Sequence, residues 1–268
     1  MRLLNKRFIA ALMGMLPLAA ASQAVSAAPV MWLTDSRGNI GYVDLADGTT
    51  TTVGFAGMLS DIAYDSSGNL WGLGFATNPT LLYRVDPSTG DTTLVGSTLV
   101  DRMNGLTFGP DGTLWGATSS NAATPSLYKI NTSNGAAMLV GSMGFACAGD
   151  LTFSGGILYM AAASFTPGGN DLLVRLNTTT GAGTLIGSLR LRHVYGLDTA
   201  EEDGVTYAVS GTSIYRVHLS NGATTFVLDY EDHGLAAAYG TAFAEIPEPG
   251  TIVILLAGGV LLSLHRRR

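Results

Sequence analysis

The stretch GLTFGPDGTLWGAT, residues 105–118, decides the fold because the chain repeats it. Related versions are DIAYDSSGNLWGLG at 61–74, DLTFSGGILYMAAA at 150–163 and GLDTAEEDGVTYAVS at 196–210. Each version has a short alternating run, a turn containing Gly, and a second run with one aromatic residue: Trp71, Trp115, Tyr159 or Tyr207. The first three aromatic residues are 44 positions apart and the fourth follows after 48. A near-constant period of this length indicates a repeat architecture.

A second phrase follows each copy of the first. Its versions are LLYRVDPSTGDTTLVGS at 81–97, SLYKINTSNGAAMLVGS at 126–142, LLVRLNTTTGAGTLIGS at 172–188 and SIYRVHLSNGATTFVLD at 213–229. These runs read as β-hairpins in which a turn glycine (90, 135, 181 or 222) supplies a positive φ. Four short strands in each repeat of about 44 residues, with no helical periodicity, match one blade of a β-propeller. We expect the blade aromatics to pack between adjacent blades.

The two ends of the repeat region complete each other. Residues 30–55 contain the second, third and fourth strands of a blade but lack the first, whereas YGTAFAEI at 239–246 fits a first strand with nothing after it. Pairing these segments would close the ring and leave no exposed edge inside it. The prediction is an all-β, five-bladed propeller over residues 29–246, with blades at about 30–55 plus 239–246, 59–97, 104–142, 149–188 and 195–229. A β-sandwich of unrelated strands would not explain the repeated phrases.

Residues 1–28 have the layout of a secretory signal peptide, with a basic start, an apolar run and small residues at the end. Cleavage near Ala27 is expected, after passage through the Sec translocon and by signal peptidase. The alternative is an uncleaved N-terminal helix.

The C-terminus resembles the PEP-CTERM sorting signal of exported bacterial proteins. Residues 247–268 contain Pro247, Glu248 and Pro249, an apolar stretch at 251–264, and then Arg266, Arg267 and Arg268. The resemblance implies recognition by an exosortase, cleavage near the Pro-Glu-Pro, and transfer to the cell surface or extracellular polymer of a Gram-negative bacterium. A helix over 251–264 would be about 21 Å long against roughly 30 Å of hydrocarbon, so a transient inner-membrane association suits it better than a permanent transmembrane helix.

The repeat region resembles gluconolactonase-like, NHL and streptogramin-lyase-like propellers through phrases such as GLTFGPDGTLWG and LYRVDPSTGDTTLVG. This resemblance covers most of residues 30–246 and implies the fold. It does not define an activity, since unrelated functions occur on propellers.

Charge and cysteine content narrow the function classes. Between residues 28 and 246 the chain has eight Arg and Lys against nineteen Asp and Glu, a net charge of −11. Such a body is not suited to nucleic acid, whose binding requires clustered cations. The one cysteine, Cys147, excludes an internal disulfide, and its small neighbours suggest a buried structural thiol.

The innermost strand of each blade lines the central channel, so its first residues are candidates for a site. Asp61, Asn104 and Asp150 could form a ring of hard oxygen ligands for Ca²⁺ or Mg²⁺ at one mouth. Lactonase-like relatives use acidic and amide ligands there, but their ligand set does not map residue by residue onto this chain. The alternative is that both carboxylates bind backbone groups at strand starts.

The only basic cluster of the body, Arg190, Arg192 and His193, lies just before an inner strand. It could contact an acidic sugar or a phosphate, or it could be a solvated loop. No catalytic residue and no zinc signature can be assigned. The favoured hypothesis is an exported, exosortase-sorted binding or structural module associated with exopolysaccharide or biofilm. The alternative is a lactonase-like or lyase-like enzyme with a divalent metal at the channel mouth.

Overall fold

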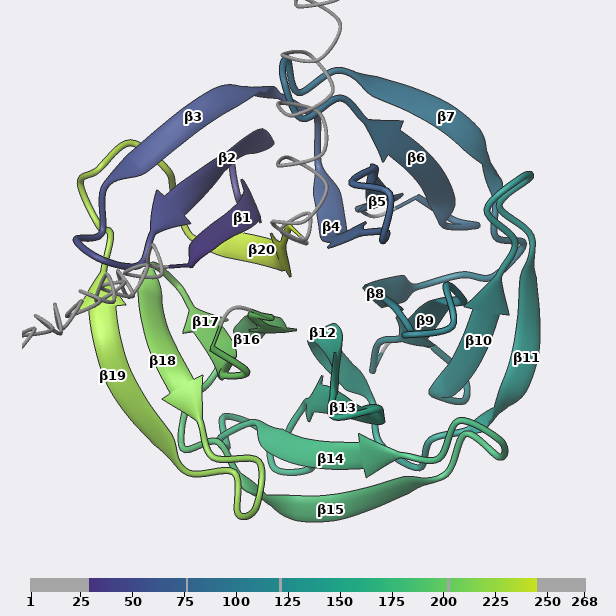
Figure 1. The fold of residues 1–268 in the computed structure, drawn as a ribbon. Coiled ribbons are helices and arrows are strands. Elements are labelled where there is room, and N and C mark those ends of the chain that lie inside the picture. The colour runs from purple at the N-terminus through teal and green to yellow at the C-terminus, as the bar shows by residue number, and fades with distance from the viewer. Residues whose placement is uncertain (1–28, 76, 121, 202, 245–268) are drawn as a thin grey trace, which may run out of the picture.

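The computed structural model describes residues 29–75, 77–120, 122–201 and 203–244. Five four-stranded antiparallel sheets are arranged as a ring around a central axis (Figure 1), and the described residues contain no helix. The predicted all-β, five-bladed propeller is therefore confirmed. The predicted signal peptide at 1–28 and the sorting signal at 247–268 lie outside the described residues. No helix within the described ranges is long and apolar enough to cross a membrane.

Each sheet is one blade, and its strands run from the axis outward. The blades, each from its innermost to its outermost strand, are β4 (Leu59–Tyr64), β5 (Leu70–Gly74), β6 (Leu81–Val85) and β7 (Thr92–Ser97); β8 (Met103–Phe108), β9 (Leu114–Thr118), β10 (Ser126–Ile130) and β11 (Ala137–Ser142); β12 (Cys147–Ser154), β13 (Ile157–Ala162), β14 (Leu172–Leu176) and β15 (Gly183–Ser188); β16 (Val194–Thr199), β17 (Thr206–Ser210), β18 (Ser213–Val217) and β19 (Thr224–Asp229); β20 (Ala238–Phe243), β1 (Val30–Asp35), β2 (Asn39–Asp44) and β3 (Thr50–Phe55).

The ring closes through the two ends of the described chain, as predicted. Strand β20 pairs antiparallel with β1, and Met31 lies opposite Phe243. The buried carboxylate of Asp35 strengthens this junction, since it accepts hydrogen bonds from the backbone amides of Arg37, Asn39 and Ala236 at 2.8–3.0 Å. Closure removes the two free sheet edges that an open stack of blades would expose at its ends.

The outer hairpins turn as the sequence predicts. Gly90, Gly135, Gly181 and Gly222 have φ values of 82°, 80°, 80° and 76°. In the DPSTG turn, the carboxylate of Asp86 accepts the amide hydrogen of Ser88 at 2.8 Å, and Asn131 and Asn177 make the same contact in their own turns. The side-chain oxygen takes the place of a backbone carbonyl as acceptor of the turn amide. This contact is local, so it favours the turn without any tertiary contact.

The hydrophobic core is divided into five clusters, and each lies between two adjacent blades. The predicted inter-blade aromatic contacts are present: ring centroids are 6.1 Å apart for Trp71 and Phe108, and 6.2 Å apart for Trp115 and Phe153. Trp32 with Tyr64 and Tyr207 with Phe243 make the equivalent contacts. Because each aromatic pair buries a large apolar area between neighbours, these contacts set the spacing of the blades.

The glycine in the recurring phrases LVGS and LIGS has a tertiary role. A Cβ atom added at Gly96 would lie 2.0 Å from the carbonyl oxygen of Asn134, in the outer turn of the next blade. Gly54, Gly141 and Gly187 face the next outer turn in the same way. Only a residue without a side chain allows neighbouring blades to approach this closely.

Candidate functional site

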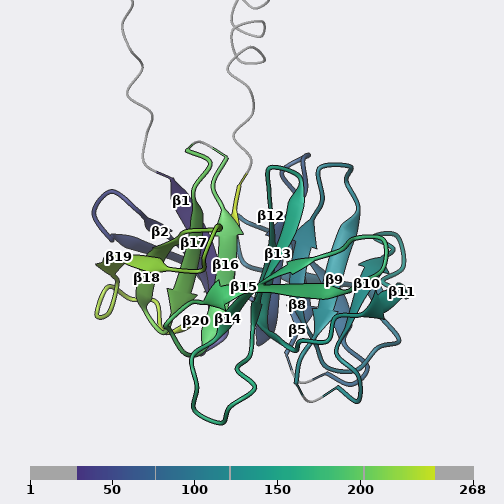
Figure 2. The same cartoon turned by 90° about the horizontal axis from the view of Figure 1, so that it is seen from below.

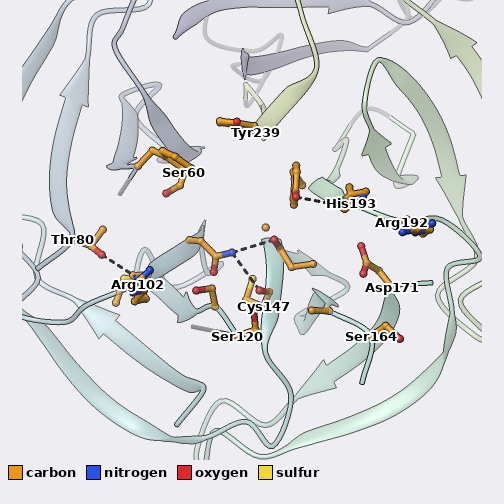
Figure 3. Close-up of a pocket in the computed structure, with 18 of the residues that line it drawn as sticks. Ser60, Thr80, Arg102, Ser120, Cys147, Ser164, Asp171, Arg192, His193 and Tyr239 are labelled. Atoms are coloured by element: carbon orange, nitrogen blue, oxygen red, sulfur yellow. Dashed lines mark hydrogen bonds between the residues drawn. The ribbon is translucent and has the colours of Figure 1, made fainter. Parts of the chain in front are cut away.

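A cavity of about 490 Å³ lies at the end of the ring where the inner strands begin. We call it the mouth cavity (Figure 3). Every blade contributes to it from the start of its inner strand: Ser60, Asn104, Cys147, Tyr195 and Tyr239. The five short first-phrase segments therefore meet at one place, although they span most of the repeat region in sequence.

Three connections rise around this cavity. They join β5 to β6 (75–80), β9 to β10 (119–125) and β13 to β14 (163–171), and residues of all three line the cavity. We call them the loop wall. The corresponding connections of the other two blades, 211–212 and 36–38, are much shorter and do not line the cavity. Residues of strand connections between the second and third strands therefore line the cavity on three consecutive blades and not on the other two.

A row of four rings follows the lower side of the mouth. The ring centroids of His193 and Tyr195 are 5.8 Å apart, those of Tyr195 and Tyr239 are 5.9 Å apart, and those of Tyr239 and Phe75 are 5.2 Å apart. All four residues line the mouth cavity, and 44 % of the Phe75 side chain is exposed. We call these residues the aromatic row. Exposed ring faces of this kind offer apolar contact to the C–H faces of a ligand.

Two arginines lie on opposite sides of the mouth cavity (Figure 3). Arg102 comes directly before β8 and Arg192 lies in the connection before β16. In the predicted basic cluster, Arg192 and His193 line the cavity, whereas the exposed Arg190 does not. Arg102 and His193 have φ values of 63° and 56°, an uncommon left-handed conformation for residues other than glycine. Arg102 and His193 each come directly before an inner strand, and they occupy equivalent positions in their two blades.

Among the residues that the structure describes, Asp171 is the one acidic residue that lines the mouth cavity. Its carboxylate accepts the amide hydrogen of Val194 at 2.8 Å and so fixes the loop wall to the start of β16. Burial raises the pKa of Asp171, although hydrogen bonds from the backbone and the nearby His193 oppose this change. Thr80 has the equivalent role in its blade, because its hydroxyl accepts the amide hydrogen of Met103 at 3.1 Å.

Buried carboxyl groups connect the inner strands next to the mouth cavity but do not line it. Asp61 accepts amide hydrogens from Ile62 at 2.8 Å and from Leu106 of the next blade at 2.6 Å. Asp150 accepts amide hydrogens from Leu151 at 2.6 Å and Leu197 at 2.7 Å. Its Oδ2 also accepts the hydroxyl hydrogen of Thr241 at 3.0 Å. These contacts connect β4 to β8, and β12 to both β16 and β20.

The two buried carboxyl groups also influence each other's pKa. Burial raises the pKa of Asp61 well above its usual range, and the charge of Asp150 raises it further. Burial also raises the pKa of Asp150. Because two adjacent buried carboxylates repel each other, this repulsion adds to the effect of burial and favours a protonated form of the pair.

The predicted ligands Asp61, Asn104 and Asp150 are not brought together at the mouth. Asn104 lines the cavity, and its Nδ2 donates to the carbonyl oxygens of Cys147 and Ala148 at 3.3 and 3.2 Å. Asp61 and Asp150 have no exposed surface and do not line the cavity, and their carboxyl oxygens accept backbone amides. This geometry suits the backbone-binding interpretation and does not fit a Ca²⁺ or Mg²⁺ ion at the mouth. Within the described residues, no group of three or more His, Cys, Asp or Glu side chains could hold a metal ion.

Cys147 also lies at the mouth cavity but is buried. Burial raises the pKa of its thiol, and the charge of Asp150 raises it further. A thiol that is harder to ionise is a poor nucleophile, so this residue has the properties of a structural cysteine.

A second cavity of about 760 Å³ lies at the opposite end of the ring, where the inner strands end. The partly buried Asp198 lines it and connects three blades. Its carboxylate accepts the amide hydrogen of Phe243 at 2.7 Å, the amide hydrogen of Thr199 at 2.8 Å and the hydroxyl hydrogen of Thr152 at 3.0 Å. Burial raises the pKa of Asp198 to about 6, despite these hydrogen bonds.

We expect the free energy of unfolding to fall as the pH rises from about 4 to about 6. The carboxyl group of Asp198 has a pKa near 3.8 when unfolded and about 6 when folded, so in this window the folded state binds more protons. Raising the pH then favours the unfolded state, by up to about 3 kcal/mol from this residue. The raised pKa values of Asp61 and Asp150 act in the same direction.

Urea denaturation at several pH values measures this change. Carboxyl groups with lowered pKa values, such as Asp35 and Asp65, act in the opposite direction near pH 4, where they still titrate in the unfolded state. Above about pH 5 they are ionised in both states, so stability that rises between about pH 5 and 6 would contradict the prediction.

Sequence reasoning identified part of the mouth cavity and missed the rest. Asn104, Arg192 and His193 were candidates and lie there, whereas Phe75, Asp171 and the pairing of Tyr195 with Tyr239 were not recognised. One signal was available, since Tyr195 and Tyr239 occupy the same position in the aligned first phrases.

No protein-family profile matches the chain, and no curated protein sequence matches it. Solved structures do resemble it. One belongs to a nidogen/laminin complex, with a TM-score of 0.54, 12 % identity, and coverage of 81 % of this chain and 98 % of that chain. Another is a gluconolactonase from Xanthomonas campestris, with a TM-score of 0.51, 16 % identity, and coverage of 76 % of this chain and 77 % of that chain. At such low identity these similarities show the fold alone: the chain is a five-bladed β-propeller with structural neighbours that include a gluconolactonase.

Proposed function

We propose that this protein is an exported, surface-sorted binding module whose mouth cavity binds an acidic polysaccharide of the extracellular matrix. The observation that carries the proposal is the combination of the aromatic row with Arg102 and Arg192 in one cavity. Sugar rings present C–H faces that pack on aromatic side chains, and a carboxylate or phosphate group on the sugar would pair with a guanidinium.

The charge distribution supports an anionic ligand. The repeat region has a net charge of −11, yet the mouth cavity contains two arginines and His193 against the single acid Asp171. Two arginines in one concave site favour an anionic ligand there, although the repeat region as a whole is acidic. Guanidinium groups suit this role because their planar donors match carboxylate and phosphate oxygens.

The path of the chain supports surface display. Strand β20 begins at the mouth cavity, where Tyr239 lies, and ends at the second cavity, which Phe243 lines. The last described strand therefore ends on the face opposite the mouth (Figure 2). If the sorting signal at 247–268 attaches the protein to the cell surface, the mouth cavity faces the extracellular medium.

Binding of a soluble polyuronate such as alginate tests this proposal. Replacing Arg192 with Gln is expected to weaken binding by about 10- to 100-fold, because a charge-assisted hydrogen bond contributes roughly 1.5–3 kcal/mol. Arg190→Gln in the same connection is the matched control, since Arg190 lies outside the cavity. Isothermal titration calorimetry at fixed salt would measure both variants.

Neutral dextran distinguishes an acidic ligand from a general affinity for sugars, and we expect it to bind weakly. Equal weakening by both Arg variants would indicate non-specific attraction between charges and would contradict a site at the mouth. Failure of the unmodified protein to bind any acidic polysaccharide would refute the proposed function.

A further inference from the structure

We infer that the mouth cavity takes the end of an acidic polysaccharide chain and not a stretch from its interior. The inference rests on the proposed function and deepens it. An interior stretch needs two ways out of a binding site, one for each direction of the polymer. A chain end needs only one, and the shape of the mouth cavity provides one.

The floor of the cavity is closed. Asp61, Asp150 and Thr241 are buried between the inner strands, and the hydrogen bonds among the inner strands leave no exposed side chain at these three positions. A Cβ atom at Gly240 would lie 2.4 Å from the Cα atom of Asp61, which shows how closely β20 and β4 approach. The mouth cavity and the second cavity share no lining residue. A polymer therefore cannot thread through the axis of the propeller.

The loop wall borders the mouth cavity along three consecutive blades. Described residues from each of the three connections line the cavity on the blades of β4, β8 and β12, among them Thr77, Ser120 and Thr166. The wall is fixed at its base, because Asp171 accepts the amide hydrogen of Val194 and Thr80 accepts that of Met103. Serine and threonine side chains of the wall, such as Ser120 and Ser164, offer hydroxyl groups to a ligand (Figure 3).

No such wall lines the cavity on the remaining two blades, and we call this side the doorway. Their short connections, 211–212 and 36–38, belong to adjacent blades. The connection 230–237 hydrogen-bonds to Ser36 and Thr212 but does not line the cavity. A chain that entered and left through one doorway would have to reverse its direction inside a cavity of about 490 Å³. Cavities of roughly 300–1,000 Å³ hold one small ligand, so a reversed polymer chain does not fit.

The aromatic row lies where an entering chain end would meet it. Tyr195 and Tyr239 begin the inner strands of the two doorway blades, and Phe75 and His193 extend the row at either side. Arg192 lies on the doorway side, whereas Arg102 lies before β8, beneath the wall. A terminal acidic unit packed against the row can therefore reach a guanidinium on either side.

The test compares alginate fractions of different mean chain length at equal mass concentration. Ultracentrifugation or surface plasmon resonance would measure the protein bound per gram of polymer at saturation. If chain ends are bound, the capacity per gram doubles when the mean length is halved, because the number of ends doubles. Short oligouronates should compete with equal potency per molecule once they exceed about three units, which is the length that a cavity of this size can contact.

Arg192→Gln and Arg190→Gln show whether the measured binding occurs in the mouth cavity. Loss of capacity in the first variant but not in the second is expected at every chain length. A capacity per gram that does not change with chain length would overturn the inference and leave the proposed function standing. Absence of binding at every length would overturn both.

Discussion

Asp150→Ala is expected to lower the free energy of unfolding by about 3–6 kcal/mol. The substitution leaves the backbone amides of Leu151 and Leu197 and the hydroxyl of Thr241 without their buried acceptor. An unsatisfied buried polar group costs roughly 1–3 kcal/mol. Because domains are stable by only about 5–15 kcal/mol, the variant should unfold at a much lower denaturant concentration or fail to accumulate. Urea denaturation followed by circular dichroism measures the change.

The effect depends on the position of the carboxylate and not on its charge. Removing a buried acid also removes the cost of burying it, which offsets part of the loss, but the three unpaired donors lie in different inner strands and cannot move together to a new partner. Asp101→Ala is the control, since Asp101 is exposed in the connection before β8. If Asp150→Ala were as stable as Asp101→Ala, the carboxylate would not hold the inner strands together.

Gly96→Ala is expected to be the second most damaging change, with a loss of at least about 2 kcal/mol. The new Cβ atom would lie 2.0 Å from the carbonyl oxygen of Asn134. That atom is backbone, so the two blades must separate to relieve the contact. Separation would weaken the hydrophobic cluster between them, which includes Trp71, Leu82 and Leu106.

Two positions serve as controls for this prediction. Thr93→Ala, on the same strand but exposed, should change the free energy of unfolding by less than about 0.5 kcal/mol. The fifth junction lies between β19 and the turn that joins β2 to β3, and there Leu228 occupies the position equivalent to Gly96. A Cβ atom built on Gly48 in that turn would lie 3.6 Å from Leu228, so this junction has room for a side chain. A mild effect of Gly96→Ala, similar to that of Thr93→Ala, would mean that the blades are not held together as closely as the structure indicates.

Much of the fold was predictable from the sequence for a local reason. Each hairpin depends on residues a few positions apart: Asp86 hydrogen-bonds within its own turn, and Gly90 supplies the positive φ that the turn requires. The repetition of these signals at a constant period then gave the number of blades. The incomplete blade at each end indicated the closure, which the pairing of Met31 with Phe243 confirms.

The mouth site was less predictable because its parts come from distant segments. Phe75 and Tyr239 stack although more than 160 positions separate them in the sequence. Neither residue has a sequence neighbour that indicates a ligand. The lengths of the five connections were visible in the sequence, but the wall and the doorway that they form depend on the order of the blades around the ring.

The sequence by itself determined the repeat, the strands, the turn glycines and the closure of the ring, because hairpin geometry and the alternation of apolar residues are local properties. Only the tertiary structure decided the role of the acids at the channel. Asp61 and Asp150 stand at strand starts where a metal ligand could also stand, and the same residue type serves either purpose. Their complete burial and the amides of Leu106 and Leu197 give them a structural role, because a carboxyl group that is removed from water must find its partners within the protein.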